Sequence, residues 1–184
     1  MSSCSFYEEL RLKYKPEKIR VLLIGVSPPK KTFFYKKNSI LYRAVFKAFS
    51  KVFNVNEINF LMFFRDLGFY LVDMFPHRCG SKIDELEDEV KENIKLKIST
   101  TEHLRHILVS EKPKAIIICF NFKRRKYTNL REIINKALEQ SRLNIQIIKY
   151  ISFPRGKHFK KTVQELKEIL KELIQKRIIP RENP

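Results

Sequence analysis

The 184-residue chain has few of the residues that build phosphate loops, metal sites and disulfide frameworks. It contains only four glycines and no G-x-G-x-x-G or Walker pattern, which argues against a nucleotide enzyme built on a glycine-rich phosphate loop. The three cysteines, Cys4, Cys79 and Cys119, form no CxxC pair and are too few for a four-cysteine metal or iron–sulfur site. Cys119 lies in an apolar run, as is typical of a buried thiol. We therefore expect no metal and no cofactor, and the chain suits a reducing cytoplasm.

Membrane and secretion signals are also missing from the sequence. The first ten residues, "MSSCSFYEEL", carry acids and lack the apolar core of a signal peptide. No apolar run approaches the roughly 20 residues that a membrane-spanning helix needs. The apolar stripe of the last helical segment is better explained by core packing than by binding to a membrane surface. We expect no membrane partner and a cytoplasmic location.

Acidic residues lag far behind basic ones. The chain has 38 Lys and Arg against 20 Asp and Glu, a formal net charge of +18. A general Lys and Glu enrichment would add acids in step with bases, so the excess favours a polyanionic partner, above all nucleic acid. The length suits one domain, residues 1–184, and we expect a monomer with a frayed tail from about residue 179.

Four short apolar runs predict buried strands, over residues 19–25, 69–75, 114–120 and 144–152. Helical patterns separate them, giving the order α-β-α-β-α-β-α-β-α. That order predicts an α/β fold with three layers, α/β/α, around a four-stranded, mostly parallel sheet. The expected helix boundaries are caps at Ser39, Ser81 and Thr100 or Thr101, stops at Gly68 and at Lys112–Pro113, and a Thr162–Glu165 capping box.

In such a sheet, ligands bind beyond the carboxyl ends of the strands, and all four segments that follow the strands are basic. The densest acids, in residues 84–92, are expected to lie elsewhere. A groove that follows a phosphate backbone is the function this pattern indicates. Phe33, Phe34 and Tyr35 lie within this basic region, either as core residues or as a platform for a stacked base. The predicted nucleic-acid contacts are Lys30, Lys31, Lys36, Lys37, Arg78, Lys123, Arg124, Arg125, Lys126, Arg155, Lys157, Lys160 and Lys161, with His77 and Lys82 nearby.

Five segments, in order, resemble motifs of the uracil-DNA glycosylase superfamily. "VLLIGVSPP" stands where that family has its first strand and water-orienting motif. "TFFY" is similar to the segment with the base-stacking aromatic, and "FYLVDMFPHR" to the second strand. "LRHILVSEKPKAIIICF" resembles the helix, Lys-Pro and third strand, and "YISFPRGKHF" stands in place of the His-Pro-Ser motif and its intercalating loop.

The resemblance implies DNA binding with a base flipped into a pocket, because the glycosidic bond is unreachable inside a stacked duplex. Pro28 and Pro29 would form a rigid pocket wall, and Arg155 would lie in the loop that wedges into the vacated stack. The implied base pocket comprises Gly25, Val26, Pro28, Phe34, Tyr35, Asn121 and Phe153.

The sequence departs from the family at the catalytic positions. The water-orienting acid or amide is replaced by Val26 and Ser27, and the histidine of the last motif is Phe153. His158 follows five residues later. The usual base-reading asparagine is Asp73, which accepts hydrogen bonds only, when ionised, and so suits uracil badly.

Two functions remain open from these residues. In the first, the protein is a DNA glycosylase with altered groups, using Asp73 with Ser27 or His158 as catalytic residues. In the second, it is a non-catalytic nucleic-acid-binding module on the same fold. Asp73 would then cap a turn or pair with an arginine, His158 would contact phosphate, and Ser27 would be a turn residue.

Overall fold

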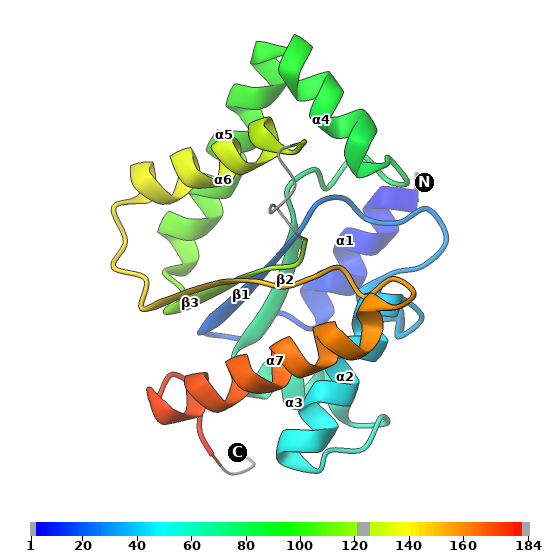
Figure 1. Ribbon diagram of the computed structural model, residues 1–184. Coiled ribbons are helices and arrows are strands. Elements are labelled where there is room, and N and C mark those ends of the chain that lie inside the picture. The colour runs from blue at the N-terminus through cyan, green and yellow to red at the C-terminus, as the bar shows by residue number, and fades with distance from the viewer. Residues whose placement is uncertain (1–2, 121–125, 182–184) are drawn as a thin grey trace.

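The computed structural model describes residues 3–120 and 126–181, and only the backbone of residues 3–5. The structure has three layers (Figure 1). The central sheet has four strands in the order β2-β1-β3-β4, and every pair is parallel. The predicted α/β/α class is thus confirmed. The strands are β1 (Val21–Gly25), β2 (Phe69–Asp73), β3 (Ala115–Ile118) and β4 (Ile147–Tyr150).

Helices cover both faces of the sheet. In Figure 1, α2, α3 and α7 lie on one side and α4, α5 and α6 on the other. Right-handed crossovers require this division, because the chain turns back between β2 and β3 and passes to the other face. The bounds are α1 (Ser3–Lys13), η1 (Phe34–Lys36), α2 (Ile40–Phe53), α3 (Phe60–Asp66), α4 (Ile83–Glu92), α5 (Ile94–Glu111), α6 (Thr128–Ser141) and α7 (His158–Gln175).

The strands form where the sequence predicts them, but they are shorter. Every residue of β1, β2 and β3 is buried, as expected for continuous apolar runs covered on both faces. β4 alternates in exposure instead: Ile148 and Tyr150 are exposed, while Lys149, on the other face of the strand, pairs with Glu172 of α7 at 2.8 Å. Tyr150 at the end of β4 and Phe153 beyond it are exposed, whereas Ile151 and Ser152 between them are buried.

Several helix boundaries follow local capping chemistry. The Ser39 side chain accepts a hydrogen bond from the Tyr42 amide at 3.0 Å and caps α2, as predicted. Gly68 has φ +83° directly after α3, which is the left-handed conformation expected of a helix-stop glycine. The predicted start at Thr100 or Thr101 is wrong. Both threonines are buried inside α5, which begins after Asn93.

The two isoleucines that follow α7 pack into the core. Ile178 and Ile179 are each only 2% exposed, and the amide of Ile178 donates to the Leu173 carbonyl at 2.9 Å. The prediction of a tail frayed from about residue 179 is therefore wrong for Ile179, because its apolar side chain completes the core beside α7. Residues 182–184 lie outside the described part of the chain.

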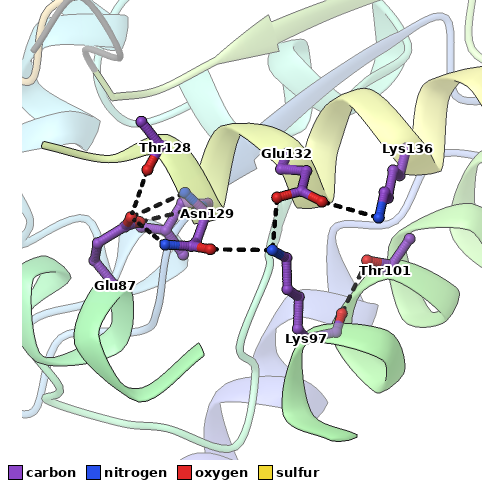
Figure 2. A network of polar contacts seen from close by, with 8 residues as sticks. Glu87, Lys97, Thr101, Thr128, Asn129, Glu132 and Lys136 are labelled. Atoms are coloured by element: carbon purple, nitrogen blue, oxygen red, sulfur yellow. Dashed lines mark hydrogen bonds and ion pairs between the residues drawn. The ribbon is translucent and has the colours of Figure 1, made fainter. Parts of the chain in front are cut away.

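A polar network joins the three helices of the α4–α6 layer (Figure 2). The buried carboxylate of Glu87 on α4 accepts from the amides of Asn129 and Leu130 at 2.9 and 3.0 Å, at the start of α6. Lys97 of α5 donates to Asn129 Oδ1 at 3.0 Å and pairs with Glu132 at 2.6 Å. Glu87 thus satisfies donors that would otherwise be left unpaired at the N-terminus of α6.

Replacing Glu87 by alanine should lower the free energy of unfolding by about 1–3 kcal/mol, because buried amide donors of α6 lose their acceptor. Urea unfolding would measure the change. Glu132→Ala is the matched control: its carboxylate is half exposed, and we expect a loss below about 1 kcal/mol. Equal losses in the two variants would contradict a capping role for Glu87.

Candidate nucleic-acid interface

The segments that follow β1 and β2 are joined by backbone hydrogen bonds into one layer at the carboxyl end of the sheet. The amide of Met74 donates to the Gly25 carbonyl at 3.0 Å, and that of Phe75 donates to Val26 at 2.9 Å. The Gly80 amide donates to the Pro28 carbonyl at 2.8 Å. These bonds fix the first two of the four basic segments against each other.

Asp73 lies within this layer as half of a buried ion pair. Its Oδ2 accepts from Arg11 Nη2 at 2.7 Å, and the two residues are 5% and 3% exposed. A Cβ at the neighbouring Gly25 would lie 2.4 Å from Asp73 Oδ1, so this position needs glycine. Burial raises the pKa of Asp73 to about 6, although Arg11 opposes the rise. Of the two interpretations of Asp73, pairing with an arginine is the one seen, but the partner comes from α1.

The three predicted catalytic residues belong to separate local structures. Ser27 Oγ donates to the Ser81 carbonyl at 3.1 Å, which ties the first basic segment to the second. His158 is exposed as the first residue of α7. Across the described residues, no hydrogen bond or ion pair joins Asp73 to Ser27 or to His158. Asp73 instead has His103 beside its backbone, and burial lowers the pKa of that imidazole.

Most aromatic side chains that were considered for stacking are core residues. Tyr35 is 2% exposed, and its hydroxyl lies 2.8 Å from the amide of Leu71. Phe34 is 3% exposed with its ring edge against Tyr42, and Phe33 stacks on Tyr7. These rings cannot receive a base without leaving the core, so the stacking role predicted for Phe34 and Tyr35 is not supported.

The other base-pocket candidates differ in exposure. Pro28 is buried, and Val26 is half-buried at the end of β1. Phe153 is 45% exposed, after β4. Asn121 lies outside the described residues, so its predicted place in the pocket stays a prediction.

All the predicted basic contacts that the structure describes are exposed; Lys123, Arg124 and Arg125 fall outside the described ranges. Several have partners within the protein. Arg78 pairs with Glu89, and Lys126 pairs with Asp84 at 2.9 Å. Both acids lie on α4, so the expectation that the 84–92 acids lie away from the basic segments is wrong. The crossover from β2 to β3 begins at the carboxyl edge, which brings α4 next to them.

Three other lysines predicted to contact nucleic acid interact with an aromatic ring, a backbone carbonyl or a neighbouring acid. Lys36 Nζ lies 4.7 Å from the ring centre of Phe6, and Lys37 Nζ donates to the Ile58 carbonyl at 3.3 Å. Lys161 Nζ is 3.9 Å from Glu165. By contrast, no ion pair with a described residue forms at Lys30, Lys31, Arg155, Lys157 or Lys160.

The structure adds Arg43, which sequence reasoning missed. A cleft of about 330 Å³, here called the α2–α7 cleft, is lined by Ile40, Arg43, Gly156 and Phe159. α2 and α7 follow parallel strands and pack side by side, so their first turns meet at the carboxyl edge (Figure 1). The sequence showed Arg43 only as a residue on the polar face of an amphipathic helix. A further cleft, of about 460 Å³ and including Lys18, Arg20 and Gly68, lies at the opposite edge of the sheet.

The described residues form no cluster of metal ligands. In the described ranges, no three His, Cys, Asp or Glu side chains gather as metal ligands. Cys119 is a buried thiol as predicted, and burial raises its pKa. The cytoplasmic location stays a prediction. Among the described helices, none is long and apolar enough to cross a membrane.

Comparison with known proteins gives no relative from which a function could be transferred. No protein-family model matches the chain, and no curated protein is significantly similar to it. The candidate interface therefore depends on the geometry and charge described above.

Proposed function

We propose that this protein binds nucleic acid, most simply DNA, through the carboxyl edge of its sheet. The observation that carries the proposal is the set of exposed cations after β1 and β4 that have no acidic partner among the described residues. A net charge of +18 would add long-range attraction to a polyanion. We also propose that it acts as a monomer.

We propose further that it binds without excising a base. Asp73 is occupied by Arg11 and is buried, and neither described cleft includes Asp73 or Ser27. A general base needs access to the water that it activates. The relationship to uracil-DNA glycosylases remains a proposal, supported by the order of the five sequence motifs alone.

Binding and incision assays on one preparation would test both statements. Labelled oligonucleotides carrying uracil, hypoxanthine, xanthine or a mismatch would be titrated at about 50 and about 200 mM salt, then treated with alkali. We expect binding that weakens at least tenfold between the two salt concentrations, and no strand break. Salt-independent binding would count against the interface. Cleavage that is lost in Asp73→Asn would show instead that the catalytic function survives.

A further inference from the structure

One large apolar side chain stands exposed beside the α2–α7 cleft. Phe153 is 45% exposed and lies three residues before Gly156, hence within about 10 Å of the cleft's lining. It is the one described member of the predicted base pocket that combines an aromatic ring with an exposed surface. An exposed aromatic ring among cations is the pattern by which proteins stack the bases of single strands.

The backbone that carries Phe153 is held rigidly by α7. The Glu165 carboxylate accepts from the amide and from the hydroxyl of Ser152, at 2.8 and 3.2 Å. Thr162 Oγ1, which is fully buried, donates to the Ser152 carbonyl at 2.7 Å. The predicted Thr162–Glu165 capping box is therefore wrong: α7 begins at His158, and both side chains hold the preceding segment. The ring of Phe153 is presented from a fixed backbone, which limits the entropy lost on binding.

Several cations line the cleft or follow Phe153 within a few residues. Arg43 lines the cleft, and Arg155, Lys157 and Lys160 are exposed on the segment and first turn beside it. Within the described ranges, none of the four forms an ion pair. The acids that neutralise Arg78 and Lys126 belong to α4, in the layer on the other side of the sheet (Figure 1).

From these observations we infer that Phe153 and the α2–α7 cleft form a binding site for single-stranded nucleic acid, with one base stacked on Phe153 and adjacent phosphates held by Arg43, Arg155, Lys157 and Lys160. This inference rests on the proposed nucleic-acid binding and specifies that the bound nucleic acid is single-stranded. A paired base is already stacked on its neighbours and cannot lie on the ring, so a duplex gains only the phosphate contacts. The positive charge at the cleft favours a polyanionic nucleic acid over the other possible occupant, an extended peptide that pairs with the edge of β4.

The chain contains no tryptophan, so Phe153→Trp introduces a single fluorescent reporter. Titration of this variant with a single-stranded oligonucleotide of about ten nucleotides should quench the tryptophan emission saturably, because a base of the oligonucleotide stacks on the indole. Met62→Trp is the matched control. Met62 is 44% exposed on α3, and we expect little quenching there.

Phe153→Ala gives the independent readout. We expect about a tenfold loss of affinity for the single strand and less than about a twofold loss for the corresponding duplex. If the variant binds both forms as the parent does, or Phe153→Trp is not quenched while binding persists, the stacking site is wrong and nucleic-acid binding stands. If the parent protein binds neither form at about 50 mM salt, both proposals fail.

Discussion

Replacing Arg11 by methionine should lower the free energy of unfolding by about 2–3 kcal/mol at pH 8, because Asp73 must then stay charged without its partner or take up a proton about two pH units above its pKa of about 6. The Arg11 guanidinium and the Asp73 carboxylate lie 2.7 Å apart, and both are almost completely buried. Removal of one charge leaves the other in a low-dielectric interior with no compensation. Chemical denaturation of the wild-type and variant proteins would measure the loss.

The loss should depend on pH. The pKa of Asp73 in the folded protein is about 6, above the ordinary carboxyl value of 3.8, and removal of Arg11 raises it further. A carboxyl with a raised folded pKa costs stability as the pH rises from its unfolded to its folded pKa. The Arg11→Met variant should therefore approach the wild type near pH 5, where Asp73 can be protonated, and fall away towards pH 8.

Two further variants identify the cause of this effect. Arg11→Met combined with Asp73→Asn removes both charges and should recover most of the stability at pH 8. Glu8→Gln removes the half-exposed acid that also contacts Arg11, at 2.6 Å, and should cost less than about 1 kcal/mol. A loss in Arg11→Met that stays the same from pH 5 to pH 8 would show that packing of the side chain, not its charge, is what matters.

Simultaneous replacement of Arg43, Arg155, Lys157 and Lys160 by glutamine should reduce affinity for nucleic acid by on the order of 1,000-fold at about 50 mM salt. Each cation that contacts a phosphate releases counterions on binding. Four contacts to a single strand contribute about −3 to the slope of log K against log salt. The variant should therefore lose both affinity and salt dependence, which fluorescence anisotropy over a salt series would record.

A second quadruple variant controls for net charge. Lys18, Lys51, Lys114 and Arg142 are exposed and precede strands or end helices at the opposite edge of the sheet. Replacing these four by glutamine removes the same charge but should leave the salt slope within about one unit of the parent value. An equal fall in both variants would mean that the protein attracts nucleic acid by net charge alone, with no defined interface.

The chain sequence determined the fold because the relevant signals are local. The apolar run 114–120 predicts a strand that is buried on both faces, as β3 is. The periodic apolar stripe from Val163 to Leu173 predicts a helix with one buried side, as α7 has. The cap at Ser39 and the stop at Gly68 depend on neighbours a few residues away. The excess of basic residues after the strands could likewise be counted directly in the sequence.

Only the tertiary structure decided which of these residues are available at the surface. Arg11 and Asp73 are 62 positions apart, and no local pattern indicates that α1 brings a buried guanidinium to the end of β2. The acids of α4 meet Arg78 and Lys126 because a crossover begins at the same edge. Phe34 and Phe153 look alike in sequence, yet one is 3% and the other 45% exposed, because η1 packs against the helices while Phe153 follows the edge strand. The sequence by itself determined an α/β/α fold with basic strand ends. Packing between distant segments decided which of those charges and rings can meet a ligand, since burial and pairing depend on neighbours that sequence order does not reveal.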